Sequence, residues 1–171
     1  MTYCVELTEL VISNSQRVDM LETYLAAKPQ YGRQYTSGSD ALTPLTIVGG
    51  YAKTDLIIHI ENQIDADLID ASYFVSNFGI NPHVDDNRQC IISYEIQNKE
   101  NIPINFHTPD GKTTRIWYTD NHPLMWNPQV MHSADRSDSE RIFFQIELKR
   151  DSVFTDYLKL LTPTHKGDHT T

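Results

Sequence analysis

Residues 89–149 read QCIISYEIQNKENIPINFHTPDGKTTRIWYTDNHPLMWNPQVMHSADRSDSERIFFQIELK, and this stretch decides the fold class. It holds short runs rich in β-branched and aromatic residues, separated by turn signals such as Pro109-Asp110-Gly111 and Asp120-Asn121. The segment TPDGK is typical of a hairpin turn. Short strands at intervals of about 8–14 residues, without intervening helices, predict an antiparallel sandwich or barrel.

The pattern extends upstream, where three more runs are predicted as strands: 45–50 (LTIVGG), 55–61 (DLIIHIE) and 68–76 (LIDASYFVS). Together with the downstream runs they predict a β-sandwich of about eight strands. A last helix is predicted over about 152–161.

The first 44 residues differ in character. Residues 3–12 predict a strand or extended entry segment. A helix is predicted over about 15–27, because Asn14 and Ser15 suit a helix start and apolar residues follow at helical spacing, namely Val18, Leu21, Leu25 and Ala26. It is expected to end near Lys28, since the residue before Pro29 disfavours helical dihedrals. Residues 28–44 are then predicted to form a long loop, either a lid or a plain surface loop.

Composition limits the class of protein. The 171 residues, 39% of them hydrophobic and 22% charged, suit one domain with a real core. We expect that domain to span residues 1–162, with a strand and helix in 1–44, a β core in 45–150 and a helix in 151–162; residues 163–171 are expected to be a flexible tail. No apolar run approaches the roughly 18–20 residues of a membrane span.

Charge and cysteine content indicate which partners and which cellular compartment to expect. The net charge of −9 argues against broad contact with nucleic-acid phosphates, although it leaves room for a small basic pocket. The beginning, MTYCVELTELVISN, has acids where a signal peptide would have basic residues. The two cysteines, Cys4 and Cys90, are expected to be reduced thiols. We therefore expect a cytoplasmic protein.

The segment NPHVDDNRQC (81–90) holds a candidate metal site. His83 and Asp85 are two residues apart on an expected strand, so their side chains share a face. Alone, the pair is more typical of a polar surface turn. Asp86 is the alternative carboxylate, but it should face the opposite side.

His132 lies 49 residues after His83 in the apolar run QVMHSA. About four strands separate the two, enough to bring the chain back beside its start in a barrel. Two histidines and one carboxylate form the facial triad of non-haem Fe(II) oxygenases. Arg141 follows nine residues later at the start of RIFFQIEL, where its guanidinium could point into the barrel and bind a distal carboxylate. Its alternative is a surface ion pair, for instance with Glu140 or Asp138.

His83-x-Asp85, His132 and Arg141, within these strands, resemble the 2-oxoglutarate- and Fe(II)-dependent dioxygenases, most closely their prolyl-hydroxylase-like branch. The resemblance covers about residues 65–150. It implies a mainly β fold with a double-stranded β-helix core, of the jelly-roll or cupin-like kind. Tyr73, ten residues before His83, stands where oxygen-sensing prolyl hydroxylases place a tyrosine that contacts 2-oxoglutarate.

The resemblance also implies an activity. His83, Asp85 and His132 would bind Fe(II) and form the catalytic centre, and Arg141 would pair with the far carboxylate of 2-oxoglutarate. Reaction with O2 would yield succinate and CO2 and hydroxylate a C–H bond, most readily in a prolyl or other amino-acid or peptide side chain. A small molecule is the alternative substrate, and nucleic acid is not expected.

Two departures concern the details. A Gly-Gly-x-Leu segment that is common in prolyl hydroxylases is replaced by IPINFHTPDGK. Arg141 is followed by Ile142-Phe143 and not by the residues of an Arg-x-Ser pattern. The second donor to the co-substrate carboxylate must come from elsewhere, and the candidates for it are Tyr73, Tyr94 and Ser93. Arg88 and Arg115 could line the mouth.

Two other classes stay open. A cupin-like barrel could bind metal through the same three residues without 2-oxoglutarate, in which case Arg141 should lie outside the barrel or in a salt bridge. A barrel without catalysis could act as an interaction module, in which case the three metal residues would diverge in space.

Overall fold

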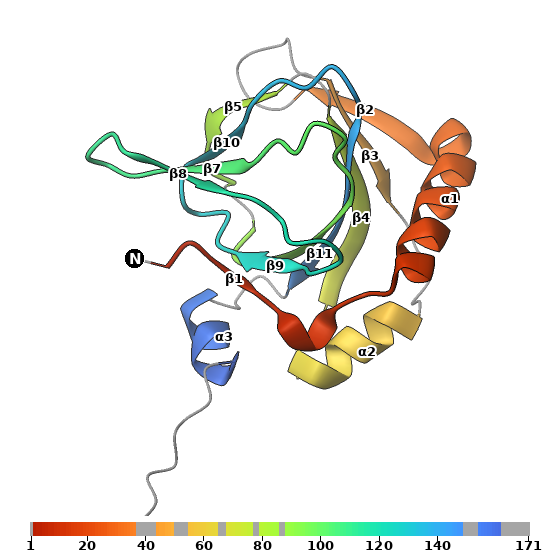
Figure 1. The fold of residues 1–171 in the computed structure, drawn as a ribbon, viewed down its shortest axis with the longest axis horizontal. Coiled ribbons are helices and arrows are strands. Elements are labelled where there is room, and N and C mark those ends of the chain that lie inside the picture. The colour runs from red at the N-terminus through yellow and green to blue at the C-terminus, as the bar shows by residue number, and fades with distance from the viewer. Residues whose placement is uncertain are drawn as a thin grey trace, which may run out of the picture.

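The structure is a computed structural model that describes residues 2–36, 44–49, 55–64, 68–76, 79–85, 88–148 and 154–161. Within these residues two antiparallel sheets face each other, and helices lie against the outer face of the larger one (Figure 1). The prediction of a mainly β, jelly-roll architecture with flanking helices is confirmed.

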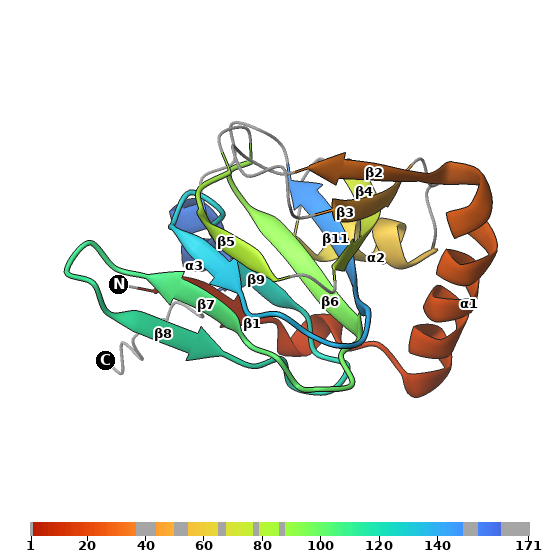
Figure 2. The same cartoon turned by 90° about the horizontal axis from the view of Figure 1, so that it is seen from above.

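The larger sheet has seven strands, in the order β1 (Cys4–Glu6), β9 (Leu124–Trp126), β6 (Ile91–Gln97), β11 (Arg141–Leu148), β4 (Leu68–Ser76), β3 (Pro44–Gly49) and β2 (Gly32–Thr36). The smaller sheet has four, in the order β5 (Ile80–His83), β10 (His132–Ala134), β7 (Ile104–His107) and β8 (Thr113–Ile116), and crosses in front of the larger one in Figure 2. The helices are the short 3-10 turn η1 (Thr8–Leu10), α1 (Asn14–Tyr31), α2 (Asp55–Ile64) and α3 (Phe154–Leu161).

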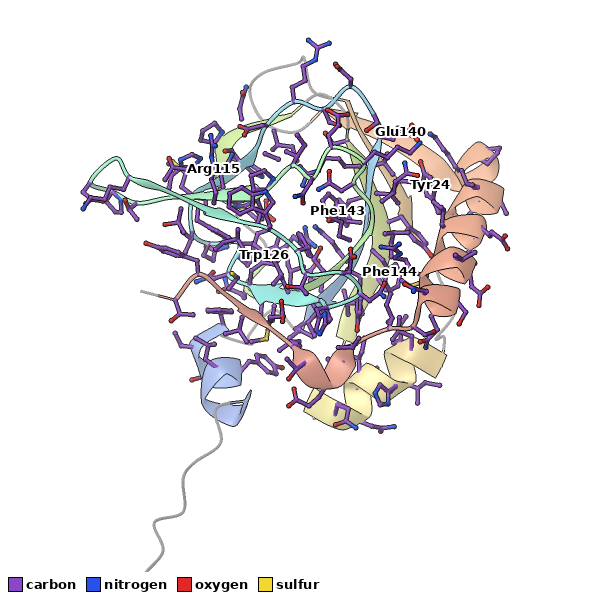
Figure 3. The ribbon with its side chains drawn as sticks, viewed as in Figure 1. Tyr24, Arg115, Trp126, Glu140, Phe143 and Phe144 are labelled. Atoms are coloured by element: carbon purple, nitrogen blue, oxygen red, sulfur yellow. The ribbon has the colours of Figure 1, made fainter. Side chains whose placement is uncertain are left out.

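Side-chain alternation along β11 separates two compartments. Phe144, Ile146 and Leu148 pack on the helix side, in the main apolar core with Met20 and Tyr24 of α1. Phe143, one residue away, faces the space between the sheets, as Figure 3 shows. A second, smaller core of Ile91, Phe106, Leu124 and Trp126 lies in that space.

The inward positions of β11 are unusual for a buried strand. They are Arg141, Phe143, Gln145 and Glu147, so three of the four are polar. Polar groups buried between two sheets need partners, and they are retained where a site uses them. The interior of the barrel is therefore where a functional site is expected.

The strand predicted over 55–61 is wrong, because this segment forms α2 (Asp55–Ile64). Ile57 and Ile60 are buried at helical spacing while Ile58 is exposed, which an alternating strand would not produce. A short apolar run is compatible with either element, and here packing against the larger sheet selects the helix.

The N-terminal region also differs from its prediction. α1 continues to Tyr31 with Pro29 inside its last turn, and β2 follows at once by pairing with β3. The last turn is anchored by Lys28, whose Nζ pairs with Glu140 and lies over the Tyr24 ring. Most of the predicted loop 28–44 is therefore regular structure, and its residues 37–43 lie outside the described part.

The buried face of α1 is also not the predicted one. Val18 and Leu25 are exposed, whereas Met20 and Tyr24 are buried against the sheet. In the described part of the chain, no helix has the length and apolar character needed to cross a membrane.

Candidate functional site

Three of the predicted residues meet at one end of the barrel. β10 pairs with β5 so that His132 lies opposite His83, and Asp85 is the second residue after the end of β5. One ligand atom from each residue lies within 4.8 Å of the others. The imidazole centroids are 4.3 Å apart, and His83 Nε2 is 3.3 Å from Asp85 Oδ1. The chain therefore converges on the two-histidine, one-carboxylate set that its spacing predicts.

Both histidines are oriented as metal ligands require. His83 Nδ1 lies 2.9 Å from the carbonyl of Asn81, and His132 Nδ1 lies 2.9 Å from that of Val130. A carbonyl only accepts, so each Nδ1 carries the proton and donates it. Each Nε2 is then the ring nitrogen left to bind a metal, and that of His83 also faces Asp85 Oδ1 at 3.3 Å. Such hydrogen bonds from the second ring nitrogen are typical of metal-binding histidines.

The protonation states also suit a metal ion. Burial lowers the pKa of His132 to about 4, so its imidazole is neutral at pH 7. Burial opposes ionisation of Asp85, but the His83 hydrogen bond and the charge of Arg88 outweigh it, and its pKa lies below the ordinary value. A neutral imidazole and an ionised carboxylate are the forms that bind divalent cations, and His132 and Asp85 are in these forms. The hydrogen bond to Asp85 raises the pKa of His83, so a metal bound there would take the place of a proton.

Arg88 holds the carboxylate side of this site. Its Nη1 is 3.5 Å from Asp85 Oδ2, its Nη2 donates to Gln145 Oε1 at 3.0 Å, and its Nε is 3.5 Å from Glu147 Oε2. The Gln129 amide donates to the carbonyls of both Asp85 and Arg88. Arg88 thus lies beside the triad, whereas the sequence suggested only that it could line the mouth. Gln145 and Glu147 could have been identified from the sequence, because they alternate with apolar residues in RIFFQIEL.

Trp126 forms the apolar wall of the triad. Its ring meets that of His132 edge to face, with centroids 4.8 Å apart, and only 3% of the residue is exposed. Phe106 packs behind it at 6.0 Å. This wall excludes water from one side of His132 and accounts for the burial that keeps the imidazole neutral.

Arg141 lies inside the barrel, where 4% of its side chain is exposed. Its Nη2 donates to the Ile102 carbonyl at 2.7 Å, and its guanidinium carbon lies 4.9 Å from the Phe143 ring centre. Glu95 Oε1 is 3.8 Å from Nη2. Within the described residues, Arg141 Nε is buried without a hydrogen-bond partner. The guanidinium therefore retains capacity to bind an anion. It also makes an ion pair with Glu95, which is the arrangement expected of a barrel that binds metal without 2-oxoglutarate.

Tyr73 and Tyr94 are not part of this site. Both lie on the helix side of the larger sheet, on either side of Phe144. The Tyr73 hydroxyl donates to the Met20 carbonyl at 2.8 Å, and that of Tyr94 donates to the Leu10 carbonyl at 3.0 Å. Their prediction as co-substrate ligands is wrong because strand alternation turns them away from the barrel.

The neighbours of Tyr94 face inward instead. Ser93 is in register with Gln145, and Glu95 with Phe143, so both point between the sheets. The Tyr118 hydroxyl lies near Ser93, and burial raises the Tyr118 pKa. Ser93 thus stays a candidate, while Glu95 and Tyr118 are inward residues that the sequence motifs do not single out. The pairing of β6 with β11 turns Glu95 inward, and no sequence motif signals that pairing.

Arg115 does not line the mouth. It lies on β8 in register with Asn105, its side chain is 60% exposed, and its Nη2 is 4.0 Å from Asp135 (Figure 3). Asp86, the alternative to Asp85, lies outside the described residues.

Comparison of the sequence with protein-family models and with curated proteins finds no match. Comparison of the fold with solved structures finds many. A prolyl hydroxylase from Trichoplax adhaerens, in complex with a peptide fragment of the hypoxia-inducible-factor oxygen degradation domain, superposes with a TM-score of 0.66 at 9% identity, over 93% of this chain and 87% of that one.

Two other structures are similar. A Pseudomonas putida prolyl-4-hydroxylase gives a TM-score of 0.59 at 11% identity, covering 88% and 95% of the two chains. HygX from Streptomyces hygroscopicus, with nickel and 2-oxoglutarate bound, gives 0.56 at 9% identity, covering 88% and 84%. The chain therefore has the fold of the 2-oxoglutarate- and Fe(II)-dependent oxygenases.

Proposed function

We propose that the protein is a dioxygenase that binds Fe(II) through His83, Asp85 and His132 and binds 2-oxoglutarate with its distal carboxylate at Arg141. The observation that carries the proposal is the triad itself. One ligand atom from each imidazole and one carboxylate oxygen lie within 4.8 Å of one another, and the Nδ1 protons are engaged by backbone carbonyls. This donor set matches the two-histidine, one-carboxylate site of non-haem iron oxygenases.

Together the metal, 2-oxoglutarate and O2 supply the oxidative chemistry, giving succinate, CO2 and a hydroxylated C–H bond. The protein's residues do the positioning. Asp85 is held by Arg88, and Gln129 donates to the backbone carbonyls of both residues. Trp126 excludes water from one side of His132. Arg141, buried and with Nε unpaired within the described residues, offers a cationic donor for a carboxylate.

A prolyl or other amino-acid or peptide side chain is the proposed substrate class, ahead of a small molecule. Support comes from the shared fold with prolyl hydroxylases, one of which holds a peptide. The net charge of −9 argues against nucleic acid as a substrate. Cys4 and Cys90 are both free thiols, which suits the proposed reducing, cytoplasmic setting.

A second candidate is a metal-binding barrel that acts without 2-oxoglutarate. The ion pair between Arg141 and Glu95 favours it, because a neutralised guanidinium attracts a dicarboxylate less strongly. The third class, a barrel without a metal site, is disfavoured because the three metal residues converge.

Anaerobic spectroscopy tests the proposal. Purified protein is loaded with Fe(II) and titrated with 2-oxoglutarate, and the visible charge-transfer band of the chelate is recorded. We expect a band in the wild type, no band in His132→Ala, and a band that needs more 2-oxoglutarate in Arg141→Ala. Arg115→Ala, which removes an exposed arginine outside the barrel, is the matched control and should titrate like the wild type.

Fe(II) binding without a band in the wild type would favour the second candidate. A band that persists in His132→Ala would overturn the assignment of the triad. Circular dichroism on each variant separates loss of binding from loss of fold.

A further inference from the structure

Glu95 lies beside Arg141, the residue proposed to bind the co-substrate's distal carboxylate. Its Oε1 is 3.8 Å from Arg141 Nη2, and both side chains are inside the barrel, 16% and 4% exposed. The two residues come from neighbouring strands, β6 and β11, and flank the same inward residue, Phe143. One guanidinium is therefore shared between a resident carboxylate and any dicarboxylic ligand.

Glu95 is also held by a neutral partner, Asn98. The Asn98 amide donates to Glu95 Oε1 at 2.7 Å and to the Ile102 carbonyl at 2.9 Å, the same carbonyl that accepts from Arg141. Asn98 thus ties Glu95 and Arg141 to one loop. Rotation of Glu95 away from Arg141 would break its short hydrogen bond with Asn98.

The charged and titratable groups around Glu95 come from three segments. Arg141 on β11 favours its ionised form, whereas Asp120, after β8, opposes it. Tyr118 lies beside Arg141, and Asp135 also acts on Arg141. Burial is the largest influence and raises the pKa of Glu95 to about 7, although Asn98 and Arg141 pull it down. Glu95 therefore changes its protonation state near neutral pH.

Two carboxylates that share one buried cation repel each other, and a proton on one of them removes the repulsion. Resting on the proposed function, we infer that Glu95 is a specificity-determining residue that competes with the co-substrate's distal carboxylate for Arg141, so that 2-oxoglutarate binds with uptake of one proton. A keto acid of the same length that ends in a methyl group, 2-oxopentanoate, has no such carboxylate and does not compete.

Isothermal calorimetry on the wild-type protein tests this directly. The protein is loaded with Mn(II) without O2 and titrated with 2-oxoglutarate at pH 6, 7 and 8, in buffers of different ionisation enthalpy. Because the affinity scales with the fraction of protein in the binding-competent state, the Kd should rise about tenfold from pH 6 to pH 8. Proton uptake should be close to one at pH 8 and close to zero at pH 6. With 2-oxopentanoate the Kd should change much less.

Glu95→Gln removes the competing charge and keeps the side-chain shape. It should bind 2-oxoglutarate at pH 8 about tenfold more tightly than the wild type, with no proton uptake. Equal affinity of the wild type for 2-oxoglutarate at pH 6 and 8, without proton uptake, would overturn the inference and leave the proposed function intact. Failure of both proteins to bind 2-oxoglutarate at any pH would overturn both.

Discussion

Tyr94→Phe separates a structural role of the tyrosine from a role in co-substrate binding. The side chain is 1% exposed, and its hydroxyl donates to the Leu10 carbonyl at 3.0 Å, on the helix side of the larger sheet. The substitution removes one oxygen and leaves the ring in place. It therefore tests the hydrogen bond without opening a large cavity.

The expected magnitude follows from that single bond. A buried hydrogen bond contributes about 0.5–1.5 kcal/mol net, and leaving its acceptor without a partner costs more. We expect a loss of about 1–2 kcal/mol, or about 2–8 °C in Tm for a chain of this length. Tyr73→Phe should cost less, because its acceptor, the Met20 carbonyl, lies within α1 and keeps its helical hydrogen bond.

Urea denaturation followed by circular dichroism measures the stability, and calorimetry measures the affinity for 2-oxoglutarate in the metal-loaded protein. Both variants should lose stability with unchanged affinity. The reasoning is refuted if Tyr94→Phe weakens 2-oxoglutarate binding tenfold or more while its unfolding midpoint stays that of the wild type.

Three further outcomes are expected. Gly79→Ala should lower the free energy of unfolding by more than about 2 kcal/mol in urea denaturation, because Gly79 has a φ of 66° and a Cβ there would lie 3.0 Å from the Ala134 carbonyl oxygen. The control Gly111→Ala, with φ 81° and open space around it, should lower it by about 1 kcal/mol. Equal losses in the two variants would contradict the close approach at Gly79. Hydrogen bonds from Ser139, Asp138 and Ser137 lower the Glu100 pKa to about 2. Its stabilising effect is therefore present above about pH 4.5 and lost as pH falls toward 2; acid titration by circular dichroism should show this loss in the wild type and less of it in Glu100→Gln. Ni(II) at about 100 times its Kd should stabilise the wild type by about 2.7 kcal/mol, roughly 5–10 °C in Tm, and His132→Ala hardly at all; an equal rise in both proteins in thermal-shift assays would place the metal elsewhere.

The metal triad and the barrel were predictable because they depend on local signals. Strand and turn composition indicates antiparallel sheets, and the His83-x-Asp85 spacing predicts two ligand groups close together. The strand β5 ends at His83, so Asp85 reaches the site from just beyond the strand and not from its face. The return of the chain to His132 then follows from the number of strands between them.

The elements that could not be predicted depend on packing and register. The run DLIIHIE is equally compatible with a strand or a helix, and burial of Ile57 and Ile60 against the sheet decides between them. Tyr94 and Glu95 are adjacent in sequence, and side chains along a strand alternate between the two faces of the sheet. An error of one residue in deciding which side chains of β6 face inward therefore places Tyr94, and not Glu95, beside Arg141. The pairing of β6 with β11 sets that parity, and no single motif encodes it.

The most direct test of the central claim is a crystal structure of the protein grown anaerobically with Mn(II) and 2-oxoglutarate, with the metal located by anomalous scattering. One Mn(II) ion is predicted, bound by His83, Asp85 and His132, with 2-oxoglutarate running from the metal to Arg141. Mn(II) bound at other residues, or a triad that holds the metal while 2-oxoglutarate is absent from Arg141, would contradict it.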